Sequence, residues 1–185
     1  MKTKVSITVA LTLFLSVLIS CNSSTKNTTI TETSVSTGIQ DNTNKYSSKM
    51  TKADKKKYYN NNNTVVYEIK YKSDGFKLRT AASDLIWKVK LYDNKVKISD
   101  NEENLNPYEI KMTDTYKAKL VKDDVALART TYDLNAKQQS IASENDAQPE
   151  FFETSYSPSL LLTKIPGIAL DQKDILIEEL KSKGY

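Results

Sequence analysis

The sequence contains no histidine, and cysteine occurs once, at Cys21. Without an imidazole, the chain lacks the commonest general base and the commonest neutral metal ligand of proteins. A single cysteine cannot form a disulfide within the chain, and an unmodified thiol would be a liability in an exported protein. We therefore expect no bound metal, no cofactor and no catalytic activity.

The chain also has a small net charge and few long hydrophobic runs. The chain has 27 Lys and Arg against 23 Asp and Glu, and two of those cations, Lys2 and Lys4, lie in the first 20 residues. The remaining excess is too small for a nucleic-acid-binding protein, and no basic face with base-stacking motifs appears. Beyond residue 20, no apolar stretch approaches the roughly 20 residues that span a bilayer. We expect neither nucleic acid as a partner nor a membrane-spanning helix in the mature chain.

The first 20 residues have the composition of an export signal. Lys2 and Lys4 precede an apolar run from Val5 to Ile19, and the small residue Ser20 follows. Leu18-Ile19-Ser20-Cys21 resembles the bacterial lipobox, and this resemblance implies cleavage before Cys21, a diacylglycerol on its thiol and acylation of the new amine. The alternative is an ordinary secretory signal before a chance cysteine. We interpret residues 1-20 as a lipoprotein signal peptide and Cys21 as the lipidation site.

Lipidation would make the chain a membrane-anchored protein of a bacterial cell envelope. Two or three acyl chains give stable anchoring, because each buried CH₂ contributes about 0.8 kcal/mol and one chain alone is marginal. Asn22 is not the aspartate that retains lipoproteins at the inner membrane in enteric bacteria, and the residues up to Asn27 lack an acidic surface-export run. The sequence therefore predicts a location at the outer membrane, facing the periplasm.

Residues 21-63 are rich in Ser, Thr, Asn and Lys and poor in apolar residues. Such a segment buries too little surface to offset the entropy lost on ordering, so we predict a disordered tether. Several of its lysines lie close to residue 63, and a basic tether could rest on anionic headgroups. A plain solvated linker is the alternative interpretation of the same residues.

Residues 64-185 are predicted to form a mainly β domain. Val65, Tyr67, Ile69 and Tyr71 alternate with polar residues, which is typical of a half-buried strand. Further short runs of this kind follow, and Asp74-Gly75 between two of them signals a hairpin. The eight expected strands are 65–71, 76–79, 85–91, 95–98, 108–112, 116–121, 125–132 and 138–143. Their even spacing predicts an antiparallel β-meander that closes into a barrel or sandwich.

The last thirty residues favour helix. Ser157-Pro158 is a good helix start, with Ser as the cap and Pro at the first helical position, and Pro166-Gly167 interrupts the segment. Asp171 as the cap, with Asp174 three residues on, predicts the start of a second helix, and Ile175 to Leu180 give it an apolar side. We expect this C-terminal hydrophobic helical segment to pack on or into the sheet.

A repeated hairpin unit suggests a family. Phe76-Lys77-Leu78 leads to Trp87-Lys88-Val89-Lys90, and Val96-Lys97-Ile98 leads to Tyr108-Glu109-Ile110-Lys111. Together with the hydrophobic C-terminal helix, this pattern resembles the LURP-one and tubby-like β-barrel proteins. The resemblance implies an antiparallel barrel around a central apolar helix and, as for several members of the family, work at membranes. We assign no functional residue to this chain from the resemblance.

Three groups of residues could hold other chemistry. Asp100 to Asn106 places oxygen atoms at alternating positions, as a calcium loop does, but Leu105 occupies the position where the sharp turn needs glycine. Asp123-Asp124 is typical of a turn. Trp87 lies in an alternating row and is predicted to be a core residue and not a platform for a ligand.

The sequence therefore predicts a non-catalytic, lipid-anchored envelope lipoprotein whose domain binds a ligand or a partner. Its partners would be the membrane, through the N-terminal lipid, and an envelope protein or a lipid. The first alternative is an accessory subunit or assembly factor of an outer-membrane complex. The second is a hydrolase that acts through carboxylates such as Glu102 or Asp123. Binding is expected at the open end of the barrel or on outward rows that include Lys88 and Lys90.

Overall fold

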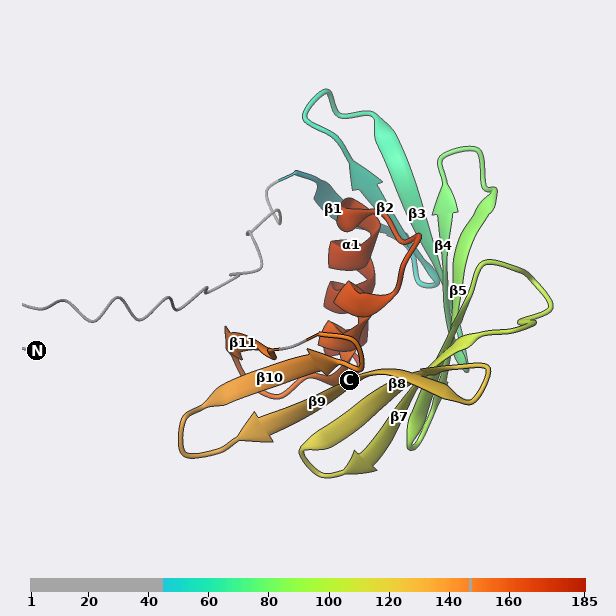
Figure 1. The fold of residues 1–185 in the computed structure, drawn as a ribbon. Helices are drawn as coiled ribbons and strands as arrows, with labels where there is room; N and C mark the ends of the chain where they lie inside the picture. The colour runs from blue at the N-terminus through green and yellow to red at the C-terminus, as the bar shows by residue number, and fades with distance from the viewer. Residues whose placement is uncertain (1–44, 147) are drawn as a thin grey trace, which may run out of the picture. The chain divides into compact units, whose positions relative to one another are not determined.

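The computed structural model describes residues 45–146 and 148–185 (Figure 1). Cys21 and the predicted signal peptide lie outside these residues, as does the predicted tether up to residue 44. Within the described residues, no helix is long and apolar enough to cross a membrane.

Within the described part of the chain, eleven strands form one sheet in which each strand pairs with its neighbour in sequence (Figure 1). All ten pairs are antiparallel, so the sheet is a meander. The strands are β1 (Ser47–Lys52), β2 (Lys55–Tyr59), β3 (Val65–Lys72), β4 (Gly75–Thr80), β5 (Leu85–Tyr92), β6 (Lys95–Ser99), β7 (Tyr108–Asp114), β8 (Lys117–Lys122), β9 (Val125–Asp133), β10 (Gln138–Ser143) and β11 (Glu150–Glu153).

Strands β3 to β10 lie where the alternating pattern predicted the eight strands. The hairpin between β3 and β4 is also present, but Gly75 has another role than the one expected from the Asp-Gly pair. Gly75 is the first residue of β4, and a Cβ atom there would lie 2.0 Å from the carbonyl oxygen of Val89. Glycine is needed at this position because β4 and β5 approach so closely.

The prediction that the tether extends to residue 63 is wrong for residues 47–59, which form the hairpin β1–β2. All six residues of β1 are exposed, and in β2 only Tyr58 is fully buried. A strand with so few inward apolar residues gives no alternating signal in the sequence. Pairing with β3 holds this hairpin on the sheet. Strand β11 was also missed, because four residues with one buried side chain, Phe152, are too short a pattern.

The expected closed barrel is wrong as well, since the sheet is open, with β1 and β11 as its edges. The prediction assumed eight strands, whereas the described residues form eleven, and β1 and β11 each pair with one neighbour only.

The two C-terminal helical segments fill the concave side of the curved sheet (Figure 1). The first is the 3₁₀ helix η2 (Pro158–Lys164), which begins after Ser157 as predicted. The second is α1 (Leu170–Lys181), whose cap position is Ala169 and not the predicted Asp171. The helix packs into the sheet, as its apolar side predicted. The core joins buried side chains of the strands to those of both helices, among them Ile69, Leu78, Ile98, Ile110, Leu120, Leu160, Leu161, Leu162 and Leu176.

Candidate functional site

The outer face of the sheet carries most of the strand lysines. Inward residues such as Ile69, Leu78 and Val89 are almost completely buried. Because successive side chains of a strand point to opposite faces, their neighbours Lys70, Lys77 and Lys88 point outward.

The strand register places four of these lysines directly beside one another. Lys55 of β2 pairs with Lys70 of β3, Lys70 pairs with Lys77 of β4, and Lys77 pairs with Lys88 of β5. With neighbouring strands about 4.8 Å apart, this row spans roughly 14 Å. Like charges directly opposite one another destabilise a sheet. The row is therefore a feature that stability alone does not favour.

Further cations extend the same face towards β9. Lys90 pairs with Lys97, and a third row runs across β6 to β9 through Lys95, Lys111, Lys119 and Arg129. We call the whole surface the cationic face. It comprises the outward Lys and Arg residues of β2 to β9, which are Lys55, Lys57, Lys70, Lys72, Lys77, Arg79, Lys88, Lys90, Lys95, Lys97, Lys111, Lys117, Lys119 and Arg129.

Two glutamates lie within the strands of this face. Glu68 pairs with Lys55 at 2.6 Å. Glu109 contacts three lysines, with Lys97 and Lys111 at 3.0 Å and Lys95 at 3.7 Å. Partial burial acts to raise the pKa of Glu109, but hydrogen bonds from Lys111 and Lys97 outweigh it and hold the pKa below its ordinary value. Glu109 thus stays ionised and neutralises only part of the charge around it.

Residues between the strands contribute further acids, since Asp74 pairs with Lys90 at 3.2 Å and Glu144 pairs with Arg129 at 2.8 Å. The loop between β6 and β7 contributes Glu102. It accepts hydrogen bonds from Lys77 and Arg79, and its main-chain oxygen accepts one from Lys88. The hydrogen bond from Lys77 lowers the pKa of Glu102, desolvation opposes this effect, and the hydrogen bond from Arg79 lowers the pKa further. A general acid needs the opposite shift. The structure therefore places this candidate catalytic residue in a surface ion pair.

The other candidates from the sequence do not converge on a site. Asp123 and Asp124 form a tight turn with positive φ at both residues, as predicted for a turn. In the loop 100–106, the Asn101 side chain forms hydrogen bonds with the main chain of Leu105, and the Asn104 side chain accepts one from Ser99 at the end of β6. No group of three or more His, Cys, Asp or Glu residues that could hold a metal occurs within residues 45–146 and 148–185.

Trp87 lies in the core, as predicted, with 8% of its surface exposed. Its indole Nε1 donates a hydrogen bond of 3.0 Å to Gln172 of α1. This bond joins the middle of the sheet to the helix.

Glu179 on α1 is the main residue that sequence reasoning missed. Its side chain is 2% exposed, yet it is well partnered: Oε1 accepts hydrogen bonds from Lys56 at 2.9 Å and Tyr58 at 2.7 Å, and Oε2 accepts one from Tyr71 at 2.7 Å. Burial and the nearby charge of Glu179 raise the pKa of Tyr58 well above its ordinary value. A signal was present in the sequence, since Glu179 lies four residues after Ile175 and shares its apolar helix side. We call Glu179 and its three partners the helix clamp.

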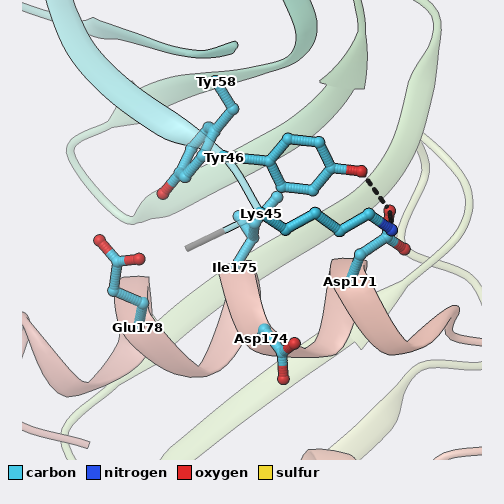
Figure 2. A pocket seen from close by; sticks show the side chains of 7 residues that line it. All are labelled: Lys45, Tyr46, Tyr58, Asp171, Asp174, Ile175 and Glu178. Carbon is cyan, nitrogen blue, oxygen red and sulfur yellow. Dashed lines mark hydrogen bonds and ion pairs between the residues drawn. The ribbon is translucent and has the colours of Figure 1, made fainter. Parts of the chain in front are cut away.

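A small pocket lies beside the helix clamp, between α1 and the start of β1. Figure 2 shows Asp171, Asp174 and Glu178 along one side of α1, with Lys45 and Tyr46 above them. Asp171 accepts hydrogen bonds from Tyr46 at 2.8 Å and from Tyr67 at 3.0 Å. The cavity measures about 30 Å³, which is the share of one water molecule in the liquid. This region therefore fixes the helix and leaves no space for a ligand.

Comparison with protein-family models, curated proteins and solved structures finds no match for this chain. The cationic face and the N-terminal sequence are therefore the features of this protein that bear on its function.

Proposed function

We propose that this protein is a non-catalytic lipoprotein of a bacterial envelope, anchored through lipid on Cys21, and that its cationic face rests on the anionic phospholipid headgroups of the membrane. The location that fits is the outer membrane, on the side that faces the periplasm. The observation that carries the proposal is the row Lys55, Lys70, Lys77 and Lys88 across four neighbouring strands.

Within the protein, Glu68 pairs with Lys55 and Glu102 pairs with Lys77, and headgroup phosphates would supply further countercharge to this row. Repulsion between the lysines falls when phosphate groups lie between them and neutralise their charge. Each Lys or Arg near an anionic membrane contributes about 1 kcal/mol of attraction at moderate salt. The sheet is curved, so only the cations of a few adjacent strands can touch a flat surface at once. Three or four of them would contribute about 3–4 kcal/mol, or a factor of several hundred in the binding constant.

The lipid and the cationic face would act together. An acyl anchor keeps the domain at the membrane, so the weaker electrostatic contact becomes an intramolecular step at high effective concentration. The anchor then determines which membrane the protein occupies, and the cationic face determines how the domain lies on it. A surface contact of this type needs no catalytic group, in agreement with the surface ion pairs of Glu102.

The mature chain from residue 21 with Cys21→Ala tests the electrostatic contact apart from the anchor. We expect it to co-sediment with vesicles of phosphatidylcholine and phosphatidylglycerol at about 0.05 M salt, and to be released at about 0.5 M salt by screening. Vesicles of phosphatidylcholine alone should not retain it.

The variant Lys88→Glu/Lys90→Glu should bind the anionic vesicles at least about 30-fold more weakly, because two attractions become repulsions worth about 2–4 kcal/mol in total. The matched control is Lys137→Glu/Lys181→Glu, which changes the net charge equally in the β9–β10 turn and at the end of α1. Equal losses in both variants would show a general charge effect and contradict a contact through the cationic face.

A further inference from the structure

The open sheet has two free edges, β1 and β11 (Figure 1). Within the described residues, β1 pairs with β2 only and β11 pairs with β10 only. The outer side of each edge strand therefore presents main-chain N–H and C=O groups that are not paired with another strand. An edge of this kind is a template to which a further strand can be added. No step of the proposed membrane contact uses either edge.

The β1 edge is basic. All six residues of β1 are exposed, and they include Lys49 and Lys52. Lys49 pairs with Lys57 of β2, and Lys52 pairs with Lys55. Because paired residues of neighbouring strands lie on the same face of a sheet, Lys49 and Lys52 point to the outer face with their partners. The residues directly opposite them thus add charge of the same sign.

The β11 edge is acidic. It consists of Glu150, Phe151, Phe152 and Glu153. Phe152 is buried in the core, so its neighbours Phe151 and Glu153 point outward, and both are exposed. Glu150 pairs with Lys164 at 2.7 Å, whereas the residue opposite Glu153 is the neutral Gln138. Glu153 is therefore the acid that lysines on an added strand would meet.

The charges of the two edges favour one pairing over the others. Two β1 strands would bring lysines together and two β11 strands would bring glutamates together, and like charges directly opposite one another destabilise a sheet. A β1 strand beside a β11 strand places lysines next to Glu153, which is a favourable cross-strand combination. The added strand would also cover the large apolar side chain of Phe151, which is 47% exposed.

We propose that copies of this protein associate edge to edge, with β1 of one copy added to β11 of the next and with Lys49 and Lys52 beside Glu153. Because the two edges are different surfaces, each copy can bind one neighbour at each edge. The four residues of β11 limit the strand pair to a small area, so the contact is weak in solution. Copies that share a membrane, as proposed above, would associate more strongly, because anchoring raises their effective concentration.

Sedimentation velocity of the mature chain with Cys21→Ala, from about 10 µM to about 1 mM, tests the contact in solution. We expect self-association that increases with concentration and decreases with salt. Lys49→Glu/Lys52→Glu should weaken it about tenfold, since attractive charge pairs become repulsive, and Glu153→Lys should weaken it as well. The matched control is Lys119→Glu/Lys181→Glu, which changes the net charge equally on β8 and α1 and should associate like the unaltered protein.

A mixture of the two edge variants separates charge pairing from loss of folding. In the mixture, the acidic β1 edge of the first variant meets the basic β11 edge of the second, so association should return although each variant alone associates weakly. Hydrogen exchange locates the contact. In the unaltered protein, the amides of β1 and β11 should exchange more slowly as the concentration rises.

Four results would overturn the proposal. The unaltered protein could stay monomeric up to about 1 mM, it could associate no more strongly than the edge variants, or the mixture could fail to restore association. Full protection of the β1 amides at the lowest concentration would show that this edge is covered within one copy. The variant Lys88→Glu/Lys90→Glu should keep its self-association, so failure of the membrane contact and failure of the edge contact can be told apart.

Discussion

Removal of the Glu179 side chain should destabilise the fold more than truncation of any other charged residue of α1. In Glu179→Ala, the hydroxyls of Tyr58 and Tyr71 and the ammonium of Lys56 lose their common acceptor. Tyr58 is 2% exposed, so water cannot replace the lost hydrogen bond there. Breaking a buried ionic pair of this kind costs about 3–5 kcal/mol. For a domain of this size, that loss lowers the unfolding midpoint by about 10–15 °C.

Urea unfolding followed by fluorescence measures this loss directly. The chain has one tryptophan, Trp87, and its indole is hydrogen-bonded to Gln172 of α1, so its emission reports the packing of the helix in the sheet. The matched control is Glu178→Ala, which removes an acid of which 53% is exposed and which pairs with the same Lys56. Exposed pairs contribute less than about 1 kcal/mol. If Glu179→Ala loses no more stability than Glu178→Ala, the helix clamp does not hold α1 and our reasoning is refuted.

Three further predictions concern the fold and the N-terminus. Burial acts to raise the pKa of Asp171, but hydrogen bonds from Tyr46 and Tyr67 and the charge of Lys45 outweigh burial and lower this pKa. A carboxyl group whose folded-state pKa is lowered stabilises the fold at pH values above its unfolded-state pKa of about 3.9. It loses this contribution as the pH falls through the folded-state pKa. The stability difference between the unaltered protein and Asp171→Asn should therefore be greatest near neutral pH and disappear in acid, whereas a constant difference in urea melts would contradict this account. Gly75→Ala should give an insoluble or strongly destabilised protein, since its Cβ would lie 2.0 Å from the Val89 oxygen; near-normal stability by the same melts would show that β4 and β5 are not so close. Cys21→Ala should accumulate as an uncleaved precursor without acyl chains, and mass spectrometry of an unmodified mature N-terminus at another residue would exclude the lipoprotein interpretation.

The sequence predicted the middle of the sheet well for a physical reason. From β3 to β10, each strand buries one face against the helices and exposes the other, so apolar and polar residues alternate. The repeated triplets Phe76-Lys77-Leu78 and Val96-Lys97-Ile98 follow from the same geometry, since their central lysines belong to the cationic face and their outer residues to the core.

The strands at the two edges could not be found in this way. Strand β1 buries no side chain, and the hairpin β1–β2 is held by pairing with β3 and by Lys56 and Tyr58 of the helix clamp. The hydrogen bonds of Lys56 and Tyr58 to Glu179 join residues more than 120 positions apart in the chain. Without β1, β2 and β11, the predicted edges of the sheet were also wrong.

The candidate site was predicted only in part. Lys88 and Lys90 were identified as outward residues, but the continuous row across four strands depends on the register of three hairpins, which composition and periodicity do not determine. The similarity to LURP-one and tubby-like proteins stays a prediction, as do the lipid on Cys21 and the envelope location.

The most direct test of the membrane contact measures the exposure of individual lysines in the lipidated protein. The protein is reconstituted into vesicles with and without phosphatidylglycerol, treated briefly with an amine-acetylating reagent, and analysed by mass spectrometry. We predict that Lys70, Lys77 and Lys88 are acetylated several-fold more slowly on the anionic vesicles and that salt removes this protection, whereas Lys137 and Lys181 react at the same rate on both. Equal rates for the cationic face on neutral and anionic vesicles would contradict the account.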